Sequence, residues 1–173
     1  MEESRKVIEF TIVFNRYKKK LYNYVLKMVN DRLMTEDIVQ NVFLKFFENL
    51  SEIQNSSSYN FWLFKTARNE ILYYFRSKRV RLDQFNVMST DDLNVLSNQD
   101  IFQETELKEI KELIMKELDL LGPEQKEVFI LKEYGGLSYK EISGILEIDE
   151  ALVKSRLYKV RQKLVNKISK LVQ

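Results

Sequence analysis

The sequence contains no cysteine and no histidine, and it has four glycines and one proline. Without cysteine the chain forms no disulfide. Without either residue it lacks the usual ligands of a zinc site and the usual Cys or His nucleophile. We therefore expect no metal, no cofactor and no enzymatic activity in the chain itself. The first glycine is Gly122, and so few helix breakers favour long helices over a β-sandwich.

Long hydrophobic runs are also missing. No apolar stretch approaches the roughly 20 residues that a membrane span needs. The N-terminal stretch MEESRKVIEF is charged and unlike a signal peptide. A cytoplasmic protein with no membrane span is therefore expected. Apolar residues make up 45% of the 173 residues and charged ones 31%, which is typical of a folded chain with one domain or two small ones.

Basic and acidic residues are unevenly distributed along the chain. Residues 1–82 carry 15 Lys and Arg against 9 Asp and Glu, and residues 150–173 carry 7 against 1. Between them, residues 83–106 carry 6 acids and no base. Two basic regions separated by an acidic one suggest contact with a polyanion at two places, although solvated helix faces explain such charge equally well.

Apolar residues recur every three or four positions in both halves, which predicts amphipathic helices. In the first half they predict three helices around one core: one ending near Asn30, one capped by Thr35, and one from about Tyr59 to about Arg79. Residues 83–106 are rich in Asn, Asp and Ser and are interpreted as an acidic linker, with a short acidic helix as the alternative. We thus expect an all-α fold of two small helical domains, residues 1–82 and 107–173.

The second half predicts a helix-turn-helix. Pro123 suits the first position of a helix. Ser138 and Glu141 form a capping-box pattern at the start of a short helix. A turn at residues 147–149 leads from it into a basic helix with one apolar stripe. This spacing is that of a helix-turn-helix, whose second helix reads DNA, and the alternative is a basic surface helix without a partner.

The outer face of this last helix suits a reader of the DNA groove. Small, hydroxyl and amide groups lie at its centre and cations at its edges, so the cations can hold phosphates while the centre meets base edges. The candidate DNA-contacting residues are Leu152, Lys154, Ser155, Arg156, Tyr158, Lys159 and Arg161.

The motif GPEQKEVFILKEYGGLSYKEISGILEIDEALVKSRLYKVRQKL resembles the C-terminal domain of bacterial RNA polymerase sigma factors of the extracytoplasmic-function (ECF) group, in the sigma-70 family. That domain reads the upstream −35 promoter element. LuxR-type response regulators have a similar pattern, so a stand-alone helix-turn-helix regulator is the alternative.

This sequence departs from the ECF pattern at several positions. Glu147 replaces the usual Gly of the turn, and because a left-handed backbone is strained for Glu, we expect the turn to be built differently. Leu152 replaces a common Thr, which favours an apolar contact with a thymine methyl. Lys154 and Lys159 stand where Arg is frequent, which loses the bidentate fork to guanine.

The motif TEDIVQNVFLKFF, residues 35–47, resembles the polymerase-docking helix of the same sigma factors. With its apolar stripe inside, its outer face is expected to present Leu44 and Phe47 among acids and amides, as a partner surface does. The alternative is a helix buried on two sides within its own domain. Family members usually have an acid at the position of Asn41. The resemblance assigns contact with the clamp-helix coiled coil of the polymerase β′ subunit to Asp37, Gln40, Asn41 and Leu44.

The motif SYNFWLFKTARNEILYYFRSKRV, residues 58–80, resembles the part that recognises and opens the −10 promoter element. Cations can track the backbone of a melted strand while rings and polar pockets hold its unstacked bases. Trp62, Phe64 and Phe75 are interpreted as core residues. The preceding loop, residues 55–60, corresponds to the family's pocket for a flipped base. The candidate −10 contacts are Arg68, Asn69, Tyr73, Arg76, Lys78 and Arg79.

Together these resemblances cover roughly residues 7–80 and 107–170. They imply a protein that binds core RNA polymerase through the β′ clamp helices and the β flap, directs it to the −35 and −10 elements of promoter DNA, and helps to melt the DNA. Many relatives are held by an anti-sigma factor, which makes such a protein a possible partner. A nucleic-acid enzyme is the third hypothesis. The lack of a metal or nucleophile constellation argues against it.

Overall fold

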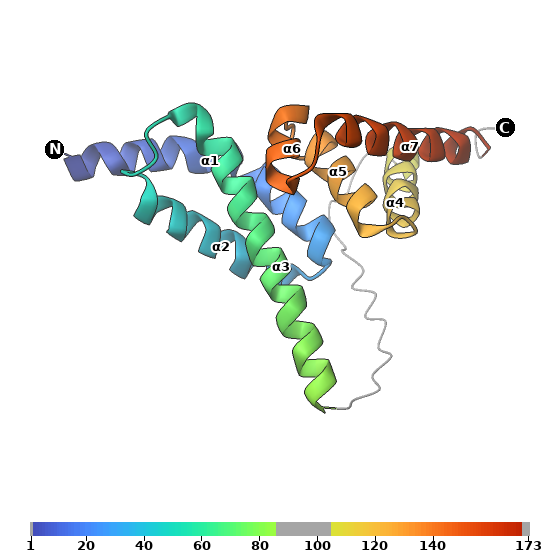
Figure 1. Cartoon of the computed structure of the whole chain (residues 1–173), viewed down its shortest axis with the longest axis horizontal. Helices are drawn as coiled ribbons and strands as arrows, with labels where there is room; N and C mark the ends of the chain where they lie inside the picture. Colours follow the sequence, from blue (N-terminus) through green and yellow to red (C-terminus); the bar gives the residue numbers. More distant parts are fainter. Residues whose placement is uncertain (1, 86–104, 171–173) are drawn as a thin grey trace. The chain divides into compact units, whose positions relative to one another are not determined.

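A computed structural model describes residues 2–85 and 105–170 of the chain, and within these ranges every regular element is a helix (Figure 1). The chain divides into two compact units, Met1–Val95 and Leu96–Gln173. The division falls inside the predicted linker, of which residues 86–104 lie outside the described residues. The all-α fold expected from the sequence is confirmed.

The first unit consists of α1 (Glu2–Val29), α2 (Arg32–Asn49), the short 3-10 helix η1 (Ser56–Ser58) and α3 (Tyr59–Phe85). The three long helices pack pairwise against one another, as their apolar stripes predict. Helix α3 runs six residues past the predicted end at Arg79. The fully buried side chains of the common core include Leu21, Tyr24, Val25, Val42, Phe46, Leu63, Phe64 and Ala67.

The junction between α1 and α2 differs from the prediction. Asp31, not Thr35, caps α2: its carboxylate accepts a hydrogen bond from the backbone N–H of Met34 at 3.0 Å. Asn30 precedes it with a left-handed backbone, φ 55°. Thr35 is buried one turn inside the helix, where its hydroxyl donates to the Asp31 carbonyl at 2.6 Å. The expected Thr35 cap is therefore wrong, because an equally good cap residue lies one turn earlier.

The second unit consists of α4 (Thr105–Asp119), α5 (Pro123–Glu133), α6 (Tyr139–Leu146) and α7 (Glu150–Ser169). Pro123 is the first residue of α5, as predicted, and Gly122 is its cap residue. The predicted capping box is also present, with the Ser138 and Glu141 side chains bonding each other's backbone N–H groups. The fully buried side chains include Leu118, Val128, Ile130, Leu131, Leu137, Ile142, Ile145, Val153 and Val160.

The turn between α6 and α7 uses a left-handed Glu147, with φ 58° and ψ 44°. The backbone N–H groups of Glu147 and Ile148 both donate to the Ser143 carbonyl, and the Ser143 hydroxyl donates to the Ile148 carbonyl at 2.6 Å. These bonds satisfy the end of α6. The expectation that Glu would force a different turn is wrong, since Glu147 adopts the conformation that Gly favours.

Replacing Glu147 by Gly is expected to stabilise the second unit by about 0.5–1 kcal/mol. The variant removes the steric cost of a Cβ in the left-handed region, and the greater freedom of Gly in the unfolded chain offsets part of the gain. Chemical denaturation measures the change. Glu147→Ala keeps the Cβ and serves as the control, so equal stability of the Gly and Ala variants would contradict the strain at this position.

Candidate docking and nucleic-acid surfaces

Helix α2 buries one face and exposes the other. Ile38, Val39, Val42, Phe43 and Phe46 point into the first unit, as the sequence predicts. On the opposite face, spacings of three and four residues bring together four exposed side chains. Leu44 is the apolar member, and 54% of it is exposed. The face consists of the four predicted docking residues, Asp37, Gln40, Asn41 and Leu44.

Phe47 does not belong to that exposed face, contrary to the prediction. Its ring packs edge-on against Phe10 of α1, with centroids 5.3 Å apart, and the Lys6 ammonium lies 4.8 Å from its centre. The residue is half-buried as a result. Periodicity places Phe47 at the border of the two faces, and the length of α1 decides on which side it lies.

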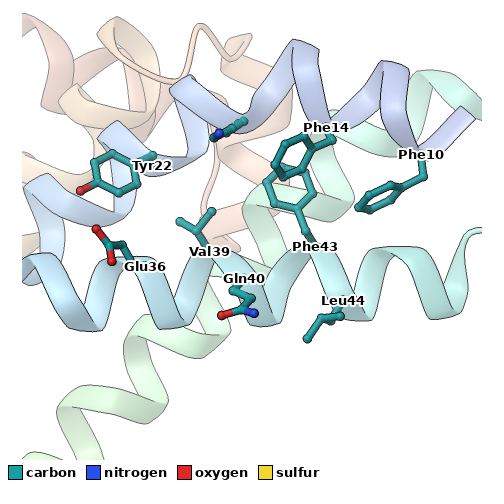
Figure 2. A pocket seen from close by; sticks show the side chains of 9 residues that line it. Phe10, Phe14, Tyr22, Glu36, Val39, Gln40, Phe43 and Leu44 are labelled. Carbon is teal, nitrogen blue, oxygen red and sulfur yellow. The ribbon is translucent and has the colours of Figure 1, made fainter. Parts of the chain in front are cut away.

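An apolar groove of about 460 Å³ runs beside the docking face between α1 and α2. The rings of Phe14 and Phe43 meet there at 4.8 Å, and Lys18 lies 5.2 Å from the Phe14 ring. Figure 2 shows Gln40 and Leu44 beside the same groove. The sequence did not predict the groove, because a helical stripe marks which rings face inward but not where they leave space between them. The lining residues are Phe10, Phe14, Lys18, Tyr22, Glu36, Val39, Gln40, Phe43 and Leu44.

The second half of α3 leaves the core, as the green helix in Figure 1 shows. Ile71 is the last buried residue of the described stretch, and none of residues 72–80 is buried. Tyr73 is 69% exposed. Of the predicted −10 contacts, Arg68 is half-buried and the others are exposed. This part of the helix therefore exposes the Tyr73 ring among several cations. The exposed set is Asn69, Tyr73, Arg76, Lys78 and Arg79.

Of the three aromatic residues assigned to the core of α3, one is fully buried, one is half-buried and one is exposed. Phe64 is fully buried against Tyr24 at 5.5 Å, and Trp62 packs on Phe46 at 5.6 Å. Phe75 is 40% exposed and lies beside Tyr74, so its assignment to the core is wrong. Its spacing continues the apolar pattern, but α1 and α2 do not extend far enough to cover it.

Tyr59 closes the loop that precedes α3. It is 6% exposed, and its hydroxyl donates a 2.6 Å hydrogen bond to the Glu9 carboxylate of α1. Burial, this hydrogen bond and the charge of Glu9 raise the pKa of Tyr59 to about 12. In the loop itself, Asn55 caps η1 by accepting from the Ser57 N–H at 2.9 Å.

The exposed face of α7 carries most of the predicted −35 contacts. Leu152 is 40% exposed and Tyr158 is 66% exposed, with Ser155 and Lys159 exposed beside them. These residues lie opposite the buried stripe that begins at Val153. The Lys154 ammonium lies over the Tyr139 ring of α6, 5.6 Å from its centre.

The two predicted arginines of α7 form ion pairs within the second unit. Arg156 pairs with Glu124, and Arg161 pairs with Glu133 at 2.6 Å. The hydrogen bond from Arg161 to Glu133 is the main cause that raises the Arg161 pKa above its ordinary value. Both acids belong to α5, so these pairs join α7 to α5. The sequence did not predict them, because the partners lie about 30 residues apart.

No group of acidic residues in the part of the chain that the structure describes forms a metal site. Within the same residues, no helix is both long and apolar enough to span a membrane.

Known protein families match both halves. Residues 13–81 match the family described as Sigma-70 region 2, and residues 111–164 match the one described as Sigma-70, region 4. The ECF RNA polymerase sigma factor SigM of Bacillus subtilis is 32% identical over 156 residues, which cover 88% of this chain and 90% of that one. The ECF RNA polymerase sigma-E factor of Escherichia coli K12 is 25% identical over 95% of this chain and 88% of its own.

Solved structures share the fold. The sigma factor RpoE of Bartonella quintana, in complex with the anti-sigma factor NepR, superposes with a TM-score of 0.70 at 20% identity over 96% of both chains. CnrH, in complex with the cytosolic domain of CnrY, gives a TM-score of 0.62 at 19% identity and covers 93% of this chain and 88% of that one. At these identities the likeness supports the fold alone.

Replacing Tyr59 by Phe is expected to change how stability depends on alkaline pH. The folded-state pKa is about 12, whereas a tyrosine in an unfolded chain ionises near pH 10. Between these values the unfolded chain releases a proton that the folded chain retains, so the free energy of unfolding falls as pH rises. Tyr59→Phe lacks this fall, which amounts to about 2 kcal/mol.

Urea denaturation at about pH 9 and about pH 11.5 measures the difference. Tyr73→Phe is the matched control, because it makes the same change at an exposed position of the same helix. A free-energy difference between wild type and Tyr59→Phe that stays constant over this range would contradict the raised pKa.

Proposed function

The chain belongs to the extracytoplasmic-function sigma factors of bacterial RNA polymerase, in the sigma-70 family, and on this premise we propose which of its surfaces performs each part of the activity. It binds core RNA polymerase and directs the enzyme to promoters. The alternative of a stand-alone regulator is not favoured, because both halves match the sigma-70 family. Residues 13–81 match region 2, and residues 111–164 match region 4.

We propose that the exposed face of α2 docks on the clamp helices of the polymerase β′ subunit. This assignment rests on one observation. One face of α2 is buried in the core, and the opposite face groups four exposed side chains, Asp37, Gln40, Asn41 and Leu44. An exposed Leu surrounded by polar groups that can form hydrogen bonds is a typical centre of a partner surface. The asparagine at position 41 supplies an uncharged amide where relatives usually supply an acid.

The second half of α3 is proposed to hold the melted −10 element. Arg76, Lys78 and Arg79 are exposed cations that suit a phosphate backbone. Tyr73, whose side chain is 69% exposed, offers a surface on which an unstacked base can stack. Arg68 and Asn69, nearer the core, are proposed to complete the site.

The outer face of α7 is proposed to read the −35 element. Ser155, Tyr158 and Lys159 offer a hydroxyl, a ring and a cation to the groove, and Leu152 offers an apolar contact that suits a thymine methyl. Lys154 lies at the edge of this face. The ion pairs of Arg156 and Arg161 give these arginines a second role, which is to fix α7 on α5 while they flank the DNA.

The domain limits are proposed as residues 1–82 for polymerase docking and the −10 element, 83–106 for an acidic linker, and 107–173 for the −35 element and the β flap. The chemistry of transcription belongs to the polymerase, and the chain itself is proposed not to be an enzyme. Its place of action is then the cytoplasm, where polymerase and DNA are found. Two structural neighbours are complexes with CnrY and with the anti-sigma factor NepR, which supports an anti-sigma factor as a further partner.

Replacing Asp37 by Arg is expected to abolish binding to core RNA polymerase, because it puts a long cation in place of an acid of the docking face. Retention of core enzyme on the immobilised variant measures the effect, and circular dichroism checks the fold. Glu3→Arg introduces the same charge change at an exposed position of α1 and should bind normally. Undiminished affinity of the Asp37 variant would remove α2 as the docking helix.

Lys159→Ala is expected to weaken binding of the holoenzyme to duplex DNA with the −35 element, because the variant removes a cation that faces the groove. Core binding should stay unchanged. Lys170→Ala removes an exposed cation from the far end of the described chain and is the control. Equal loss of DNA and core binding would argue that the Lys159 variant is misfolded.

A further inference from the structure

One short stretch of α1 contacts both ends of the loop between α2 and α3. Lys6, Glu9 and Phe10 lie on the same face of α1, since they are three and four residues apart. Lys6 and Phe10 pack on Phe47 near the end of α2, and Glu9 accepts the hydrogen bond from Tyr59 at the start of α3. The loop, residues 51–58, is therefore attached at both ends to the same stretch of α1.

The loop is compact and presents short polar groups. The Ser58 N–H donates to the Asn55 carbonyl at 2.9 Å, and the Ser57 N–H donates to the Asn55 side chain, so the turn is fixed internally. Asn55, Ser56 and Ser57 are exposed. Amides and hydroxyls of this kind bond the edges of unstacked bases, and the loop leads directly into the helix whose exposed half carries cations and a ring.

The Tyr59 hydroxyl is the polar link in this arrangement. The ring itself is buried against Phe46, with centroids 5.1 Å apart in an edge-on contact, and a Phe at this position would fill the same space. The hydroxyl adds a directional bond to Glu9, which fixes where α3 begins relative to α1. Because η1 is continuous with α3, the same bond fixes the orientation of the loop.

We propose that Tyr59 and Glu9 are positioning residues for promoter recognition: their hydrogen bond holds loop 51–58 in the geometry that captures one unstacked base of the −10 strand. The proposal rests on the proposed role of α3 in binding that strand. Neither residue needs to touch DNA, and Glu9 lies on a helix without any predicted DNA contact. The bond contributes to reading one base and not to docking on the polymerase.

The test uses holoenzyme and single-stranded oligonucleotides that span the −10 element of a promoter the holoenzyme transcribes. Each base is replaced in turn by an abasic site, and the loss of affinity is measured at every position. In Tyr59→Phe the loss of affinity at one position should shrink by about tenfold, which is the lower end of the worth of a hydrogen bond to a charged group. The losses at the other positions should stay as in wild type. Core binding should be unchanged.

Companion variants separate positioning from general damage. Glu9→Gln retains an oxygen that accepts from Tyr59 and should behave like wild type, whereas Glu9→Ala should behave like Tyr59→Phe. The double variant Glu9→Ala/Tyr59→Phe should be no worse than either single variant, because both remove the same bond. Additive losses, or a uniform loss at every position, would overturn the proposal.

Two further outcomes are distinguishable. If one base is read strongly by wild type and equally strongly by Tyr59→Phe, the positioning role is wrong and the proposed function stands. If wild-type holoenzyme shows no sensitive base and does not retain the −10 strand, both the positioning role and the proposed role of α3 are wrong.

Discussion

The burial of Phe46 is the contact on which the first unit depends. This side chain of α2 is fully buried, and its ring meets Tyr59 and Trp62 of α3 and Phe10 of α1. One residue thus fixes the rotation of α2 about its own axis relative to both neighbours. Once Phe46 points inward, helical geometry forces Asp37, Gln40, Asn41 and Leu44 outward. The docking face is therefore a consequence of core packing.

The second unit obeys a similar constraint through its last helix. Val153, Leu157, Val160 and Leu164 form the stripe that holds α7 on the rest of the unit. The ion pairs of Arg156 and Arg161 with α5 border the same contact. Surface ion pairs are weak individually, so the apolar stripe supplies most of the stability. The ion pairs restrict the orientation of α7 on α5. The face opposite the stripe stays exposed, and it is the face that we propose reads DNA.

Much of this architecture follows from patterns within one helix. Apolar spacing located every long helix of the described residues, and local hydrogen-bonding chemistry located the Ser138 capping box and the Gly122–Pro123 start. The errors arose where two local signals compete or where a distant element decides. Asp31 and Thr35 are both good caps, and the chain uses the first. Phe47 and Phe75 have apolar side chains near the border of a stripe, and the reach of neighbouring helices determines which one is covered.

Contacts between residues far apart in the sequence could not be predicted, again because a distant element decides them. Glu9 and Tyr59, or Arg156 and Glu124, are joined by the tertiary fold and share no local pattern. The left-handed Glu147 shows the converse case, since the surrounding bonds to Ser143 impose a conformation that the residue itself disfavours. The candidate surfaces were thus predictable as helix faces, whereas the contacts that position them were not.

This chain confers promoter selection on core RNA polymerase. To test this directly, the purified chain is mixed with core enzyme and genomic DNA fragments, and the 5′ ends of the transcripts are mapped. We expect discrete start sites that require both proteins and share two upstream sequence elements. Duplex DNA binding by the chain alone, with no retention of core enzyme and no new start sites, would contradict it.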